Sequence, residues 1–82
     1  MTRYYFDLEE DGGTAIDEEG LELSTMQRVQ EEAARSLADM ARDTVAKLDG
    51  GTPYEMTVAV RDDVGPVLRV SGKFEIDRLR KQ

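Results

Sequence analysis

The sequence predicts an α+β domain of order β-β-α-β-β, with one amphipathic helix packed on one face of a four-stranded antiparallel sheet. Apolar side chains alternate near both ends of the chain, a central stretch repeats them at steps of three and four, and turn residues separate these segments. The chain of 82 residues makes one domain, 1–82, with a polar tail from about residue 77.

The first expected strand lies near the N-terminus. Tyr4, Phe6 and Leu8 should point toward the helix, whereas Tyr5 and Asp7 should point to the other face. This alternation places most of the aromatic run in the core and leaves Tyr5 alone outside. We therefore do not expect a surface for stacking nucleic-acid bases here.

A glycine-containing turn at 11–13 should reverse the chain into a short second strand at 14–16. A second turn at 17–20 follows, after which Leu21 and Leu23 return to the core. The second strand is the least strongly patterned element of the prediction.

The helix is expected over residues 24–48. Ser24 and Gln27 have the spacing of a capping box, in which the serine hydroxyl accepts a hydrogen bond from the amide three residues later. Gly50 and Gly51 should end the helix, and Pro53 should prevent its resumption. The apolar stripe expected to face the sheet consists of Met26, Val29, Ala33, Leu37, Met40, Ala41, Thr44 and Leu48.

Two further strands should form a hairpin after the helix, with the turn at 62–66. Their expected inward side chains are Tyr54, Met56, Val58, Val60, Leu68, Val70, Phe74 and Ile76. Gly72 falls on the same apolar face, where a bulge or a close helix approach would fit. With the first strand between the second and third, the sheet takes the antiparallel order 2-1-3-4, and the crossover through the helix is right-handed.

Composition restricts the possible chemistry. The chain contains no His, Cys or Trp, which argues against zinc sites of the usual ligand types, thiol nucleophiles, disulfides and imidazole acids or bases. We predict no catalytic, cofactor-binding or metal-binding residues, and no enzymatic activity. A core of this size supplies only about 3–5 kcal/mol of net stability, so self-association is expected.

Charge is segregated along the chain, whose net charge is −7. Residues 1–23 carry eight acids and one base, whereas residues 69–82 carry two acids and five bases. The net charge should repel phosphate backbones, so any binding of nucleic acid would depend on the short basic tail with Arg78, Arg80 and Lys81. A solvated tail is the simpler interpretation.

One acidic motif matches the spacing of an EF-hand calcium loop, through Asp7, Glu9, Asp11, Gly12 and Glu18. However, the segment before it is patterned as a strand, and Thr14 takes a position that is normally aliphatic. We expect an acidic hairpin, with a cation site as the open alternative.

The other groups with catalytic chemistry have simpler explanations. Adjacent carboxylates at 62–63 and 17–19 are typical of solvated turns, and nothing in the sequence provides a base for the Ser24 hydroxyl. A single helix on a small sheet also leaves little room for a pocket that would shift a carboxyl pKa.

The sheet face opposite the helix is the more useful candidate for binding. We expect it to be mixed, with a basic bias, and to carry Tyr5, Thr57, Ala59, Arg61, Val67, Arg69, Ser71 and Lys73. Such a face suits a partner sheet or an acidic peptide. It suits water equally well, because antiparallel sheets often leave one face solvated.

Two functional hypotheses result. The first is a small non-enzymatic interaction module, a weak homodimer or the binder of another protein, that uses the open sheet face or an exposed edge strand. The alternative is a regulator that binds nucleic acid or a basic protein through its segregated charge. We expect a cytoplasmic location, because the start resembles no signal peptide and no apolar run approaches the roughly 20 residues of a membrane span.

Several segments together resemble a known family. They are the run Arg3–Asp7, the Asp11–Gly12 turn, the run Asp17–Gly20, the helix segment Ala33–Asp39 and the hairpin from Val60 to Leu68. The chain resembles, over nearly its whole length, a group of short uncharacterised proteins, a domain of unknown function common in soil and plant-associated bacteria. The resemblance implies a free-standing bacterial domain without an assigned activity, and it implies no functional residues.

Overall fold

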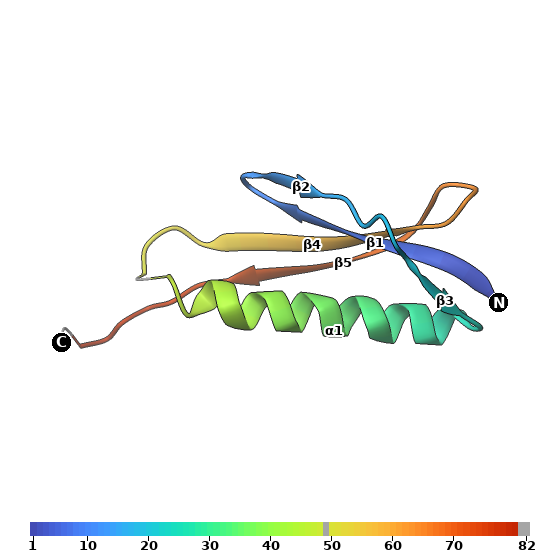
Figure 1. Cartoon of the computed structure of the whole chain (residues 1–82). Coiled ribbons are helices and arrows are strands. Elements are labelled where there is room, and N and C mark those ends of the chain that lie inside the picture. The colour runs from blue at the N-terminus through green and yellow to red at the C-terminus, as the bar shows by residue number, and fades with distance from the viewer. Residues whose placement is uncertain (49, 81–82) are drawn as a thin grey trace.

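The computed structural model describes residues 1–48 and 50–80, and its strands form one layer with the helix along one face (Figure 1). The elements are β1 (Thr2–Glu10), β2 (Gly13–Ala15), β3 (Leu21–Leu23), α1 (Met26–Val45), β4 (Tyr54–Arg61) and β5 (Pro66–Phe74). This architecture confirms the predicted α+β fold with one helix on an open antiparallel sheet.

The strands follow the order β2-β1-β4-β5, which is the order expected from the sequence, and all the pairings are antiparallel. The sheet has one strand more than expected, because Leu21–Leu23 forms β3 rather than merely returning to the core. β3 pairs with Thr2–Tyr4 and β2 with Leu8–Glu10. One edge of β1 is therefore covered by two short strands with a gap between them.

The core lies between α1 and the inner face of the sheet. In β4, Met56, Val58 and Val60 are each 1% exposed, and they alternate with more exposed neighbours as the sequence pattern predicts. Phe6 lies opposite Val60 and Leu8 lies opposite Val58, so β1 presents its predicted apolar side chains to the same core. From α1 the buried residues are Val29, Ala33, Leu37 and Ala41.

The ends of α1 differ from the prediction. Thr25, and not Ser24, is the N-cap, because its Oγ1 accepts a hydrogen bond of 3.1 Å from the amide of Arg28. Met26 therefore falls in the first turn and is 51% exposed instead of buried. At the other end, Lys47 and Leu48 donate to the carbonyls three residues earlier, so tighter turns replace the last predicted turn of the helix.

Beyond β5, residues 75–80 form neither helix nor strand and extend past the end of α1 (Figure 1). Part of the predicted polar tail, including Lys81, lies outside the described residues. No helical segment in the described ranges combines the length and the apolar character that crossing a membrane requires.

Candidate interaction surface

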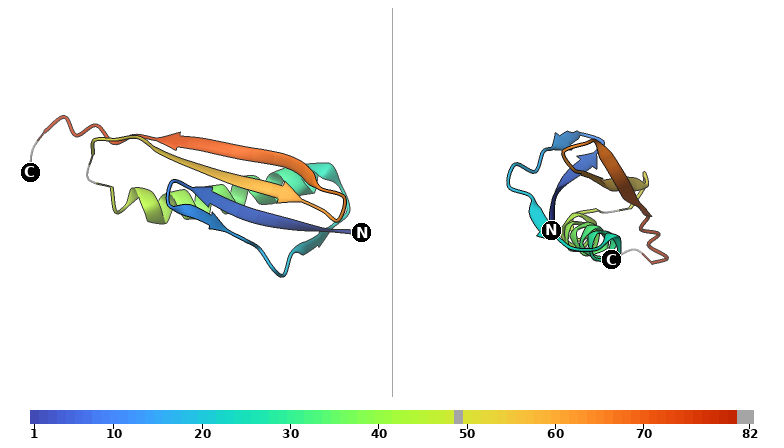
Figure 2. Two further views of the ribbon diagram at one scale, coloured as in Figure 1. Left: turned by 90° about the horizontal axis from the view of Figure 1, so that it is seen from above. Right: turned by 90° about the vertical axis from the view of Figure 1, so that its right-hand side faces the viewer.

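The face of the sheet opposite α1 is formed by alternate side chains of β1, β4 and β5. The left view of Figure 2 looks onto this side, with α1 behind the strands. Asp7, Ala59 and Arg69 lie side by side across it, as do Glu9, Thr57 and Ser71. Two of these six residues, Asp7 and Glu9, are acids of β1, and they give negative charge to a face that was expected to be basic.

Ion pairs cross this face between strands. Arg69 on β5 reaches over β4 to Glu9 on β1, with 2.9 Å between Nη2 and Oε1. Arg61 on β4 places Nε 2.8 Å from Oδ2 of Asp7. The open face carries four acids and four bases when β3 is included, namely Asp7, Glu9, Glu22, Glu55, Arg3, Arg61, Arg69 and Lys73. It is therefore neutral rather than basic, on a chain whose net charge is −7.

The gap between β2 and β3 is filled by Asp17. Its Oδ2 accepts a hydrogen bond of 3.1 Å from the backbone amide of Phe6, which neither β2 nor β3 reaches. Its Oδ1 accepts from the amides of Glu19 and Gly20, also at 3.1 Å, and holds the loop in a tight turn. The carboxylate thus replaces the backbone acceptor that an unbroken strand would have supplied.

Asp7 and Arg61 complete this network. The Asp17 amide donates to Oδ1 of Asp7 over 2.9 Å, and Nη2 of Arg61 donates to the Asp17 carbonyl over 3.0 Å. The Arg61 guanidinium also lies over the ring of Tyr5, 4.5 Å from its centroid. Asp7 is 8% exposed, and among the described residues no buried side-chain nitrogen or oxygen lacks a partner. The network therefore fixes the loop to the sheet.

The electrostatics of the network agree with its geometry. Partial burial of Asp17 disfavours its charged form, but the amides of Phe6, Gly20 and Glu19 and the charge of Arg61 outweigh this effect, so the pKa of Asp17 lies below its ordinary value of 3.8. The hydrogen bond to Asp7 raises the pKa of Arg61 above its ordinary value. Both groups are held in their charged forms, which suits an ion-pair network and not proton transfer.

The structure does not bring the calcium-loop residues together. Asp7 and Glu9 pair with arginines, Asp11 is exposed in the β1–β2 turn, and Glu18 is exposed in the following loop. Within residues 1–48 and 50–80, no group of three potential ligands is close enough to hold a metal ion. The motif spacing falls on an antiparallel hairpin, whose side chains alternate between two faces.

The other candidate groups lie in separate parts of the chain. Asp62 accepts hydrogen bonds from the amides of Val64 and Gly65, at 2.9 and 3.1 Å, and shapes the β4–β5 turn. Ser24 is exposed beside the true helix cap, and residues 78 and 80 are exposed arginines beyond the sheet. The structure therefore does not gather these groups into a common site with the Asp17 network.

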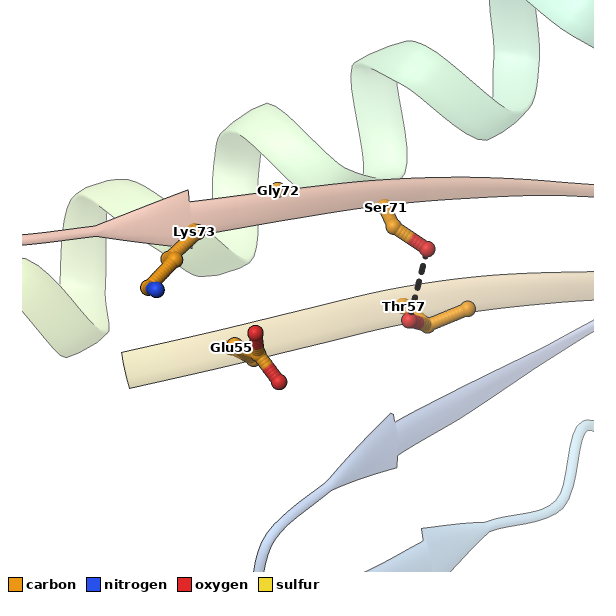
Figure 3. A pocket seen from close by; sticks show the side chains of 5 residues that line it. All are labelled: Glu55, Thr57, Ser71, Gly72 and Lys73. Carbon is orange, nitrogen blue, oxygen red and sulfur yellow. Dashed lines mark hydrogen bonds between the residues drawn. The ribbon is translucent and has the colours of Figure 1, made fainter. Parts of the chain in front are cut away.

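A hollow of about 350 Å³ lies on the open face where β4 and β5 run together, lined by Glu55, Thr57, Ser71, Gly72 and Lys73 (Figure 3). The hydroxyls of Thr57 and Ser71 bond to each other over 2.8 Å. Because each hydroxyl already has a partner, this hollow offers a polar contact surface and no activated nucleophile.

The two edges of the sheet differ in kind. One consists of β2 and β3, which have three residues each and are separated by the acidic loop 16–20. The other is β5, which runs for nine residues and, among the described residues, has no strand on its outer side (Figure 2). The sequence indicates an exposed edge strand as a binding surface without distinguishing the two edges, because its pattern does not reveal β3.

A family model for a domain of unknown function, DUF6894, matches residues 3–72. The chain belongs to the DUF6894 family. The match confirms the resemblance to an uncharacterised family. The part of the chain that matches the DUF6894 domain includes the Asp17 network and β5 as far as Gly72. No curated protein and no solved structure matches the chain. Roles for its residues therefore have to be argued from the geometry.

Proposed function

We propose that this DUF6894 domain is a small non-enzymatic interaction module that associates weakly with a second copy of itself. The observation that carries the proposal is the asymmetry of its surfaces. One sheet face is covered by α1 and one edge is broken by an acidic loop, whereas β5 and the neutral open face are available to a partner.

The charges favour contact through this side of the molecule. Two chains of net charge −7 repel each other, and the repulsion is weakest where acids and bases are already paired. The Arg69–Glu9 and Arg61–Asp7 pairs lie on the open face and leave it balanced. A second copy therefore approaches at lower electrostatic cost here than at the acidic hairpin.

The proposal leaves catalysis out because the polar groups that the structure gathers on the open face serve other purposes. The carboxylates of Asp7 and Asp17 bind backbone amides and Arg61, and the Thr57 and Ser71 hydroxyls bind each other. None of these groups combines a free reactive atom with a neighbouring base, which nucleophilic catalysis needs.

Sedimentation velocity over a wide range of protein concentrations tests the proposal. We expect the weight-average mass to rise from that of the 9.2 kDa chain toward twice that value. A strict monomer at the highest concentration would contradict self-association. Retention on heparin at low salt, in place of a rise in mass, would favour the alternative of a nucleic-acid-binding regulator.

A further inference from the structure

We propose that the outer edge of β5 pairs antiparallel with β5 of a second copy, around a two-fold axis at Val70. This inference rests on the proposed self-association and names the surface that makes it. The result is one continuous sheet across two subunits, with both helices on the same side. Antiparallel pairing of identical edges is an isologous contact, so it closes as a dimer.

The first step is that most of β5 is free of the backbone irregularities that usually prevent edge pairing. Natural edges are kept short, bulged, covered or charged. The opposite edge of this sheet follows that rule, since it is divided into two three-residue strands by an acidic loop. β5 is nine residues long, and its proline, Pro66, and its bulge, at Val67, both lie at its start, so that Leu68–Phe74 runs on without interruption.

The second step concerns the two bases of β5. Arg69 and Lys73 would deter pairing if they projected over the free edge. Instead, Arg69 turns inward across β4 to Glu9, and Lys73 lies opposite Glu55 of β4. Arg69 is thus directed toward an acid of its own chain, Lys73 has an acid as its cross-strand neighbour, and the free edge is left to backbone groups and half-buried apolar side chains.

The third step is the register. Pairing β5 with itself around its middle residue, Val70, places the bulged start of each strand at an end of the contact. In this register Arg69 lies opposite Ser71 of the partner, and Leu68 lies opposite Gly72 of the partner. A shift of two residues either way puts Arg69 opposite Arg69 or Lys73 of the partner, and like charges directly opposite each other destabilise a strand pair.

The helix supports the same arrangement. In the left view of Figure 2, the first turn of α1 extends past the edge formed by β5. Met26 lies in this turn and is 51% exposed. A partner strand added to β5 would extend the sheet over this turn, which gives the exposed methionine an apolar surface to contact.

Charge variants at Ser71 test the register. Ser71 is exposed and would face Arg69 of the partner twice in each dimer, so Ser71→Glu should tighten the dimer and Ser71→Arg should weaken it. We expect the two dissociation constants to differ by about tenfold. Ser71→Gln is the matched control, because all three variants lose the hydroxyl bond to Thr57.

Cysteine cross-linking tests the surface independently. The chain has no cysteine, and residues directly opposite in an antiparallel pair have Cα atoms about 4.5–5.5 Å apart, within the span of a disulfide. Val70→Cys should therefore form a covalent dimer on mild oxidation. Ala59→Cys, in the middle of the open face, should not.

The outcomes separate this inference from the proposed function. Self-association with efficient cross-linking of Ala59→Cys, or with equal dissociation constants for Ser71→Glu and Ser71→Arg, would overturn edge pairing and leave an interaction module that uses the open face. A monomer at every concentration would overturn both. If Val70→Cys fails to fold, the Ser71 variants still decide the question, because their exposed site does not contribute to the core.

Discussion

At the residue scale, a single carboxylate takes the place of missing strand structure. Asp17 accepts the hydrogen bond from Phe6 that lies between the pairings of β2 and β3 on β1. It also closes its own loop through the amides of Glu19 and Gly20. In the sequence Asp17 is typical of a solvated turn, but in the structure it connects the loop before β3 to β1.

Replacing Asp17 by asparagine should destabilise the domain at neutral pH by about 1–3 kcal/mol, because hydrogen bonds to a charged acceptor are weakened or lost. The pKa of Asp17 is lowered in the folded state, so its contribution is fully present above the ordinary value of 3.8 and is lost as the pH falls through the lower folded value. In urea unfolding, the gap between wild type and Asp17→Asn should therefore narrow below about pH 4.

Glu18→Gln is the matched control for this experiment, since Glu18 is exposed in the same loop. Its stability should stay within about 0.5 kcal/mol of wild type. An equal loss of stability in both variants would show that removing a negative charge from the loop, and not breaking the hydrogen bonds of Asp17, causes the loss.

Gly20 is the second residue on which the loop depends. Its φ is +72°, and a Cβ atom there would lie 2.9 Å from the Tyr4 carbonyl oxygen and from side-chain atoms of Arg3 and Tyr5. We expect Gly20→Ala to lower the free energy of unfolding by about 1–3 kcal/mol. Gly12→Ala is the control, because a Cβ atom at Gly12 would meet nothing within 4 Å, and the thermal unfolding of this variant should remain close to wild type.

At the scale of elements, the two adjacent hydroxyl residues at the start of α1, Ser24 and Thr25, have different roles. Thr25 provides the cap, so Thr25→Ala should destabilise the domain by about 1 kcal/mol. Ser24→Ala should have little effect, because Ser24 is exposed and one residue outside the cap. Denaturant titration of both variants measures the loss of stability at each position. A larger loss for Ser24→Ala than for Thr25→Ala would contradict the observed start of the helix.

The elements that could be predicted are those with local causes. Alternation along Tyr54–Arg61 and the repeat of Val29, Ala33 and Leu37 depend on neighbours a few residues apart, so they can be recognised in the sequence. The cap was predicted at Ser24, one residue too early, because Ser24 and Thr25 are both residue types that cap helices. Secondary structure follows from local pattern more readily than the position of its ends.

The candidate surface was predicted less completely, because its ion pairs join residues that are far apart in the chain. The open face was expected to be basic because its expected residues left out Asp7 and Glu9, although alternation along β1 places both acids on it. The network of Asp7, Asp17 and Arg61 joins residues up to 54 positions apart, and no periodicity in the sequence reports such a contact. The sequence contains one indication of this network, because alternation along the two strands places Asp7 and Arg61 on the same face, opposite the core.

At the scale of the whole molecule, the net charge of −7 controls how two copies meet. Edge pairing at β5 forms backbone hydrogen bonds and apolar contacts, and it requires no ion pair between subunits. The charge that remains between the copies is therefore repulsive. This repulsion is long-ranged, so it depends on the ionic strength of the solution.

We accordingly expect dimerisation to strengthen with salt. Raising the ionic strength from about 0.01 to about 0.15 M shortens the screening length from about 30 to about 8 Å, so the dissociation constant from sedimentation should fall several-fold. The double variant Glu18→Lys/Glu19→Lys replaces two negative charges by two positive ones on each chain, far from β5, and so changes the net charge from −7 to −3. Its dissociation constant should be lower at low salt and should change less as salt is added. A dimer that weakens with salt would instead show that ion pairs join the two copies, as they would if the charged open faces met.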